Sequence, residues 1–371
     1  MHITCSSSAP GISPQNINDY KSNGSGFMGG ENPHRQNTNN LSTKILGDMD
    51  NIRYLCTDMS RLIDNIADFL VENGFELSFQ IRHDFDVIVT RTLDGRHTKV
   101  ILPLEISAGT IEEAEAESYN AEDAIRMITR EAGYPLIITE DRWRSQRQMM
   151  EARLLAHLEL FSQAYARNCE VRRIEKAEAQ EFLKRNHSYG DAACKYRYGL
   201  FLKRHTGHIA AEMGFPIGSG MTDEVKNLSE GTLIAVATFS NARRWLKEGK
   251  EIRSYEWTRY ASLPDLRVSG GMGKMLKAFI KEVQPDDIMS YADLEWSEGE
   301  VYERLGFEAE TRKEPVTFTI DPQTWERTAI RRSTVKLGIT EGDNVIPDQI
   351  GDLFFRNFGS RKFRLKLTDY K

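Results

Sequence analysis

Apolar and polar residues alternate along the chain with two periods, one typical of helices and one typical of strands. Apolar residues recur at helical spacing from Leu62 to Leu70 and stop before the pair Asn73-Gly74, which predicts a helix. The runs FELSFQI, FDVIVT and KVILPLEIS that follow are rich in β-branched and aromatic residues and predict strands. An Asp-Gly turn in RTLDGRHT predicts that the last two strands form a hairpin.

The pattern then returns to helices. An acidic helix is predicted over residues 111–131, followed by a short buried strand in YPLIITE. The stretch DRWRSQRQMMEARLLAHLELFSQAY, residues 141–165, predicts one long helix with a basic early face and an apolar later face. This first unit is a small α/β arrangement that ends near residue 168.

A second unit begins with a predicted helix over residues 175–185. Strands are predicted in YRYGLFLK, GTLIAVATFS, IRSYEWTRYASLP, DIMSYADLEW and PVTFTID, with helices between the later ones. This order predicts a mixed α/β (α+β) fold in which helices flank a central sheet. After residue 322 come a basic stretch, RTAIRRSTVK, a Gly/Asp-rich loop and a last strand, SRKFRLKL.

Composition divides the chain into four predicted parts. Residues 1–50 are rich in Ser, Asn and Gly, and we expect a disordered tail because they cannot bury enough apolar surface. The remaining parts are a small α/β domain over 51–168, a second domain over 169–321 and a basic C-terminal extension over 322–371 that packs on the second domain.

Cysteine usage favours a cytoplasmic protein. The 371 residues carry a net charge of −6, and the four cysteines show no C-x-x-C spacing, so we expect free thiols. The pair His205 and His208 is more typical of a turn than of a metal site. The start lacks the pattern of a secretory signal, and the longest apolar stretch is too short to span a bilayer, so no membrane partner is expected.

A glycine-rich turn precedes one predicted helix, in VSGGMGKMLKAFIKEV, residues 268–283. The apolar residues from Met272 to Val283 form a single helical face, so the helix begins at about Gly271. Free amides and the dipole make a helix start suitable for an anion, and glycine allows close approach. The turn is therefore either a close-packing element or a phosphate cradle. The candidate ligand-binding residues are Gly270, Gly271, Met272, Gly273 and Lys274.

A second motif follows in YADLEWSEGEVYERLGFE, residues 291–308. Ser297 with Glu300 predicts a capping box, and Gly306 predicts the end of a short helix. The glycine turn, the next strand and VYERLGF together resemble the Gcn5-related N-acetyltransferase (GNAT) superfamily, over roughly residues 172–320. In that family a Q/R-x-x-G-x-G/A turn holds the pyrophosphate of acetyl-CoA, and a tyrosine of a later segment protonates the departing thiolate.

The resemblance implies roles for particular residues. Backbone amides from Gly271 to Lys274 would contact the pyrophosphate of acetyl-CoA or another acyl-CoA, with no metal, and Tyr302 would be the general acid. Val268 stands where the family has Gln or Arg. A base must also accept the proton of the amine. Glu256 and Asp293 lie on strands expected to flank the substrate cleft, and Glu256 is the preferred candidate. The alternative is that either carboxylate is a buried partner of Arg253 or Arg259.

The chain is also similar to phage and mobile-element proteins in which a Vsr-like domain of homing-endonuclease type precedes a GNAT-like domain. There the nuclease ligands would be Asp86 and Glu105, two hard oxygen donors on neighbouring strands that suit Mg²⁺. Ser107 stands where such a nuclease would place a lysine. The other interpretation is that both carboxylates only face solvent.

Two further features have alternative interpretations. His187, in NHSYG, lies either near an acyl site or at the end of a helix. Arg142, Arg144 and Arg147 form either a surface for DNA or RNA phosphates or a solvated helix face.

Two functions are therefore open. The leading hypothesis is a CoA-dependent N-acyltransferase that modifies an amine. The alternative is a mobile-element protein that binds nucleic acid or resembles a homing endonuclease, with an idle GNAT-like domain. A minor option within it is an active Mg²⁺ nuclease that uses Asp86 and Glu105. The acceptor amine and the oligomeric state are not specified by the sequence.

Overall fold

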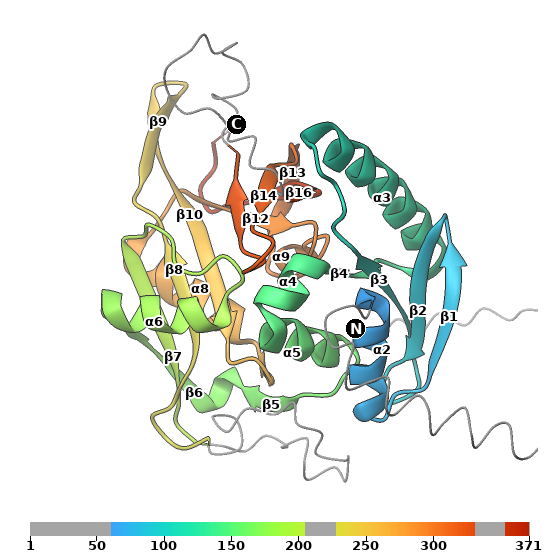
Figure 1. Ribbon diagram of the computed structural model, residues 1–371. Helices are drawn as coiled ribbons and strands as arrows, with labels where there is room; N and C mark the ends of the chain where they lie inside the picture. The colour runs from blue at the N-terminus through green and yellow to red at the C-terminus, as the bar shows by residue number, and fades with distance from the viewer. Residues whose placement is uncertain (1–60, 205–227, 331–352, 371) are drawn as a thin grey trace, which may run out of the picture. The chain divides into compact units, whose positions relative to one another are not determined.

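Helices pack against four β-sheets in the computed structural model, which describes residues 61–204, 228–330 and 353–370 (Figure 1). The predicted mixed α/β class is confirmed. All described residues belong to one compact unit, Ser60–Lys371. The predicted tail and the pair His205 and His208 lie outside the described residues. Within the described ranges, no helix combines the length and the apolar character that a membrane span requires.

The first sheet has four strands in the order β1-β2-β3-β4. Its strands are β1 (Leu77–Arg82), β2 (Phe85–Arg91), β3 (Thr98–Leu104) and β4 (Leu136–Thr139). The predicted hairpin is confirmed because β2 and β3 pair antiparallel, with Ile88 opposite Ile101, while β4 joins β3 in parallel. The helices of this region are α2 (Leu62–Glu72), α3 (Ile111–Ala132), α4 (Glu140–Ser145) and α5 (Arg147–His157).

Both faces of this sheet are covered, because alternate residues of a strand point to opposite sides. Ile88 and Ile101 belong to a core that includes residues of α2 and α5. Their neighbours Val87 and Leu102 belong to a second core that includes residues of α3. In Figure 1 the sheet accordingly lies between α2 and α3.

The long helix predicted over residues 141–165 is wrong. Gln146 has φ −130° and ψ 38°, which separates α4 from α5, and α5 ends at His157. Residues Ser162–Tyr165 form strand β5, which pairs in parallel with β11 (Leu266–Ser269). A short 3-10 turn, η1 (Ala166–Asn168), follows β5. Pairing with a strand about 100 residues away overrides the local helical pattern.

The second sheet has eight strands, with the order β13-β17-β12-β10-β8-β7-β6 and β9 paired to β10. Its strands are β6 (Cys169–Arg173), β7 (Tyr196–Leu202), β8 (Leu233–Phe239), β9 (Arg243–Lys247), β10 (Lys250–Ser262), β12 (Asp287–Asp293), β13 (Glu308–Lys313) and β17 (Ser360–Lys366). Strand β17 comes from the predicted C-terminal extension, yet it lies between β12 and β13. The predicted extension therefore supplies an interior strand of this sheet.

Two helices cover opposite faces of the eight-stranded sheet, α6 (Lys176–Asn186) and α8 (Gly271–Val283) (Figure 1). The ring of Phe279 on α8 stacks on Phe239 of β8, with centroids 3.9 Å apart. Tyr196 and Tyr198 of β7 also contact Phe279, so the residue between them, Arg197, faces the α6 side.

Two small elements complete the described structure. Three strands, β14 (Thr317–Ile320), β15 (Arg327–Ala329) and β16 (Leu353–Arg356), form a separate sheet in the order β15-β14-β16. The short helix α9 (Glu300–Arg304) begins after Gly299, whose φ is 90°, without a side-chain cap. The predicted capping box is therefore wrong, because the Ser297 hydroxyl accepts a hydrogen bond from the amide of Gly299 instead. The predicted end is confirmed, since Gly306 has φ 88°.

Replacing Phe279 by alanine should destabilise the protein, because the cavity removes a fully buried ring at the centre of the sheet's α8 face. The free energy of unfolding should fall by about 3–5 kcal/mol, measured by urea denaturation. The matched change Phe79→Ala, at an exposed ring of β1, should have little effect. Equal effects of the two changes would contradict this assignment of the core.

Candidate functional site

The centre of the eight-stranded sheet contains the parallel strand pair β10 and β12, which separates partway along its length. The strands pair only from Ser254 opposite Asp287 to Glu256 opposite Met289. Beyond that point β10 continues to pair with β8, through an irregularity between Trp257 and Arg259, and β12 continues to pair with β17. The facing edges of β10 and β12 are therefore not paired with each other beyond Glu256.

Side chains from three elements meet where the two strands separate. The Ser290 hydroxyl lies 3.0 Å from the carbonyl oxygen of Trp257 and 2.9 Å from the Tyr302 hydroxyl. A hydroxyl has a single proton, so when Ser290 donates to the carbonyl, Tyr302 donates to Ser290. The ring of Tyr302 stacks on Phe363 with centroids 5.2 Å apart. Burial raises the pKa of the Tyr302 phenol, so it is protonated at neutral pH.

The glycine-rich turn forms the start of α8. Gly270 has φ 77°, a left-handed conformation, and no side chain caps the helix. A Cβ at Gly271 would lie 3.0 Å from the Tyr260 hydroxyl oxygen, and a Cβ at Gly273 would lie 3.3 Å from Leu305. Tight packing therefore favours glycine at these two positions, and the side chains of Tyr260, Val268 and Leu305 already lie close to this part of the turn. The packing and ligand-binding interpretations are compatible.

The ammonium group of Lys274 binds backbone carbonyl oxygens, whereas a phosphate-binding lysine would direct it toward the ligand. The Lys274 ammonium donates hydrogen bonds to the carbonyl oxygens of Ala166, at 2.8 Å, and Cys169, at 2.5 Å. These contacts tie the first turn of α8 to the segment that connects β5 with β6. Val268, which replaces the Gln or Arg of the motif, packs against Gly271.

The turn and the tyrosine are linked by direct packing. Leu305, which follows α9 and contacts the position of Gly273, lies three residues from Tyr302. On the other side, the ring of Tyr260 contacts Trp257, and Trp257 contacts Tyr302, with centroids 6.1 and 6.3 Å apart. The structure thus brings together the glycine turn, the point where the strands separate and Tyr302.

Glu256 is the last paired residue of β10 before the strands separate. Its side chain is 24% exposed and lies 3.7 Å from Arg243. Neither of the expected arginine partners forms an ion pair with it in the described structure: Arg253 pairs with Asp286 at 3.4 Å, and Arg259 donates to the carbonyl oxygen of Gly190 at 3.0 Å.

His187 ends helix α6, as one of its two interpretations required, and its amide donates to the carbonyl oxygen of Leu183. Its Nδ1 accepts a hydrogen bond from the amide of Tyr189 at 3.1 Å. Burial, followed by the charges of Arg259 and Arg142, lowers the pKa of His187 to about 4. The imidazole is therefore neutral at pH 7.

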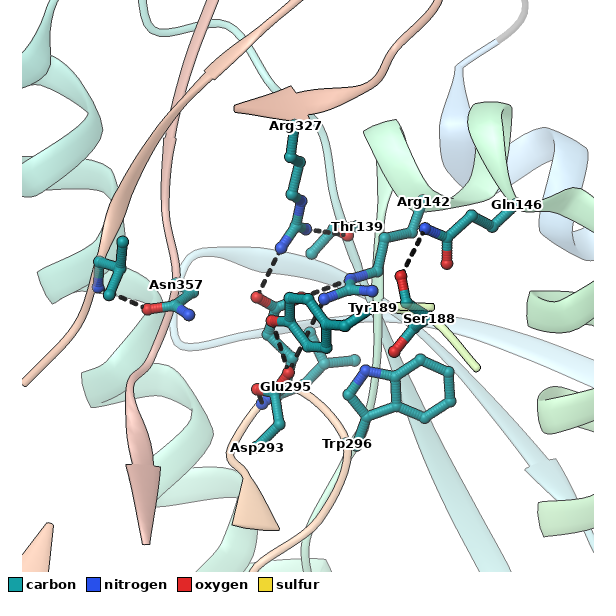
Figure 2. Close-up of polar contacts among 12 residues, drawn as sticks. Thr139, Arg142, Gln146, Ser188, Tyr189, Asp293, Glu295, Trp296, Arg327 and Asn357 are labelled. Atoms are coloured by element: carbon teal, nitrogen blue, oxygen red, sulfur yellow. Dashed lines mark hydrogen bonds and ion pairs between the residues drawn. The ribbon is translucent and has the colours of Figure 1, made fainter. Parts of the chain in front are cut away.

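A buried ionic network lies beyond the end of β12 (Figure 2). Glu295 accepts hydrogen bonds from Arg142 at 2.9 Å and from Arg327 at 2.7 Å, and all three side chains are at most 9% exposed. Arg327 also binds Asp141 and donates to the Thr139 hydroxyl at 2.9 Å. The network thus joins the end of β4 and the start of α4 to the residues after β12 and to β15.

The same network reaches the loop after α6. The Tyr189 hydroxyl donates to Asp293 at 2.8 Å, and the Arg142 guanidinium lies 4.8 Å from the centre of the Tyr189 ring (Figure 2). Burial and then the charge of Glu295 raise the pKa of Asp293. Arg153 closes the cluster by donating to the carbonyl oxygens of Ile137, at 2.6 Å, and Glu295, at 2.9 Å.

The three arginines proposed for nucleic acid do not share one surface. Arg142 is buried in the network, whereas Arg144 pairs with Glu140 at 2.9 Å and Arg147 pairs with Glu151 at 2.5 Å. The latter two have side chains that are 34% and 43% exposed.

The proposed nuclease carboxylates do come together, around an arginine. Arg61 binds Asp86 at 2.6 Å and lies 3.7 Å from Glu105. In the part of the chain that the structure describes, no group of three or more His, Cys, Asp or Glu side chains is placed to hold a metal ion. The positive charge beside these two carboxylates is that of the Arg61 guanidinium.

Sequence reasoning missed Ser290, Glu295 and Arg327. Glu295 follows the apolar strand of DIMSYADLEW directly, and a charged residue that close to a buried strand is a signal for a buried pair. Ser290 and Arg327 give no comparable signal, because a single serine in a strand and an arginine in a basic stretch are common.

Replacing Glu295 by glutamine should be strongly destabilising, because it leaves the buried charges of Arg142 and Arg327 with fewer counter-charges. Removing one partner of a buried ion pair costs about 3–5 kcal/mol, which chemical denaturation would measure. Glu300→Gln is the matched control, since its pair with Arg304 is exposed and should contribute little. Wild-type stability in Glu295→Gln would contradict the network.

The pH dependence of stability should show the ionisation of Glu295. Burial alone would raise its pKa, but the charges of Arg327 and Arg142 outweigh burial and hold the pKa below its usual range. A lowered folded pKa gives stability that is present above the unfolded pKa of about 4.3 and lost as the pH falls through the folded value. The raised pKa of Asp293 has the opposite effect on the pH dependence of stability, because its protonation on acidification favours the folded state.

We therefore expect the loss of unfolding free energy on acidification below about pH 4.3 to be smaller in Glu295→Gln than in the wild type. Urea denaturation at a series of pH values gives the slope of unfolding free energy against pH for each protein. Equal slopes for Glu295→Gln and the wild type would show that Glu295 does not titrate with a lowered pKa.

Comparison with known proteins leaves the family open. No family model and no curated protein matches the chain. Among solved structures, a match is a chain described as "The crystal structure of KacTA-DNA complex", with 17% identity and a TM-score of 0.23. It covers 38% of this chain and 86% of that chain. At this TM-score the likeness carries no argument about fold or function.

Proposed function

We propose that the protein is a GNAT-type N-acyltransferase that transfers an acetyl or other acyl group from CoA to an amine. The observation that carries the proposal is the separation of β10 and β12 beside the Tyr302 hydroxyl, with the uncapped start of α8 packed next to it. A strand edge without a strand partner, a protonated phenol and a helix start each match one part of acyl-CoA.

Each part of acyl-CoA has a matching feature. The arm that ends in the thiol contains amide groups, which can pair with backbone groups of the separated edges of β10 and β12 as an added strand does. The carbonyl oxygen of Trp257 is the exception, because it already accepts a hydrogen bond from Ser290. The pyrophosphate suits the free amides and the positive dipole end at Gly271–Gly273. Lys274 does not take part in this proposal, because its ammonium is bound to two carbonyl oxygens.

The chemistry follows from these positions. The amine nitrogen attacks the thioester carbonyl, a C–N bond forms, and the C–S bond breaks to release a thiolate. The Tyr302 phenol gives its proton to the thiolate, while Glu256, directly or through water, accepts a proton from the amine. No metal is required for this step. The proposal includes a cytoplasmic location. The free thiols of Cys169 and Cys194 support it, because thiols stay reduced in that compartment.

The nucleic-acid alternative lacks a comparable observation. Arg142 is buried, and Arg144 and Arg147 pair with glutamates on their own helices. A DNA or RNA partner therefore stays a prediction from the basic stretches of the sequence.

A charge at the start of α8 should control binding of acetyl-CoA. Gly270→Asp places a carboxylate where the pyrophosphate is proposed to lie, and Gly270→Asn is the neutral control of the same shape; both residues tolerate a left-handed backbone. About 1.4 kcal/mol of repulsion weakens binding tenfold, so we expect at least that difference in calorimetric titrations. Equal affinities in the two variants, or no binding by the wild type, would refute the cradle.

Loss of the Tyr302 hydroxyl should slow acyl transfer without weakening acetyl-CoA binding. In Tyr302→Phe we expect kcat to fall by about 10²–10⁴-fold, measured as thiol release from acetyl-CoA with a panel of amines. Tyr291→Phe, on the neighbouring strand β12, is the matched control. Unchanged kcat in Tyr302→Phe would exclude Tyr302 as the general acid.

A further inference from the structure

A cavity of about 510 Å³ opens on the α6 side of the eight-stranded sheet. Its wall combines the start of α6, the loop after α6, β7 and the turn between β8 and β9. The charged residues in the wall are Lys176, Asp191, Arg197 and Arg243, so three cations face one carboxylate. This volume suits a small polar molecule.

Two residues in the wall have hydrogen-bonding capacity that the described protein does not use. Arg197 donates from one terminal nitrogen to the carbonyl oxygen of Cys194 at 2.8 Å, but its Nε is buried without a partner. One carboxylate oxygen of Asp191, Oδ1, is also buried without a partner. Buried polar atoms are nearly always satisfied. A ligand that carries both an acceptor and a donor would give each side chain a partner.

The cavity lies next to the proposed reaction site. Arg243, in the cavity wall, is 3.7 Å from Glu256, and the hydroxyl of Ser240, also in the wall, accepts a hydrogen bond from the Glu256 amide at 2.9 Å. Glu256 itself borders the cavity rather than lining it. Because Trp257 contacts Phe239 and Tyr302 on the α8 side, Glu256 points to the α6 side, where the cavity is.

We propose that this cavity binds the acceptor, and that the acceptor is a small primary amine that also carries an anionic group, a carboxylate or a phosphate. The anionic group binds Arg197 and Lys176, which pair well with either anion. The ammonium group lies toward Asp191 and Glu256, where a proton can leave before the nitrogen attacks. The identification of the ligand as an acceptor rests on the proposed function; the binding of an anionic amine does not.

Calorimetric titration with small amines tests the binding. The probes are O-phosphoethanolamine and β-alanine, which carry an amine with a phosphate or a carboxylate, and ethanolamine, which lacks the anion. We expect at least one anionic amine to bind about tenfold or more tightly than ethanolamine, because a charge-assisted pair contributes about 1.5–3 kcal/mol. The stronger of the two probes identifies the anion.

Variants locate the ligand. Arg197→Gln should weaken binding of the anionic probe about tenfold or more. Lys176→Gln should have the same effect, and because Lys176 is exposed at the start of α6, this variant is expected to fold normally. Arg185→Gln, at an exposed site on the same helix, is the matched control and should bind normally. Ethanolamine affinity equal to that of both anionic probes, no binding of any probe, or normal binding by both Arg197→Gln and Lys176→Gln would overturn the proposal.

The same panel separates this inference from the proposed function. If anionic amines bind and depend on Arg197 but are never acylated, the cavity assignment stands and the acyltransferase proposal fails. If ethanolamine is acylated with the same kcat/KM as the anionic probes, and Arg197→Gln does not change that value, the acyltransferase proposal stands and this inference is refuted.

Discussion

The carboxylate of Glu295, buried between Arg142 and Arg327, is the contact on which the arrangement of the sheets depends. It lies where β4 and α4, the residues after β12, and β15 converge, so a single side chain fixes segments far apart in the sequence. Buried charges are costly unless they are paired and hydrogen-bonded. Satisfying two arginines with one glutamate restricts the relative placement of these segments.

This constraint extends to the candidate site through β12. The network holds one end of that strand, and β17 holds its far edge along the whole length from Asp287 to Asp293. The other edge of β12 pairs with β10 only as far as Met289 and then separates from it. The separation places Ser290 between Trp257 and Tyr302 and creates the unpaired strand edges that the acyl-CoA proposal uses.

Much of the local structure could be predicted because its signals are local. The helix at Leu62–Glu72, the hairpin of β2 and β3, and the start of α8 at Gly271 follow from apolar spacing and turn residues. The predictions failed where tertiary contacts override the local pattern. Residues 162–165 pair with β11 instead of continuing a helix. Helix α9 begins after Gly299, in a left-handed conformation, instead of after the predicted cap Ser297.

The sequence by itself determined the class of fold, many of the elements, the glycine turn and the tyrosine that follows it, because periodicity and turn chemistry act over a few residues. Only the tertiary structure decided that β17 enters the sheet, that Arg142 is buried rather than exposed, and that Lys274 binds carbonyl oxygens. These outcomes depend on which distant charges and strand edges find partners, and burial makes an unpartnered group costly. No local pattern in the sequence encodes that choice of partner.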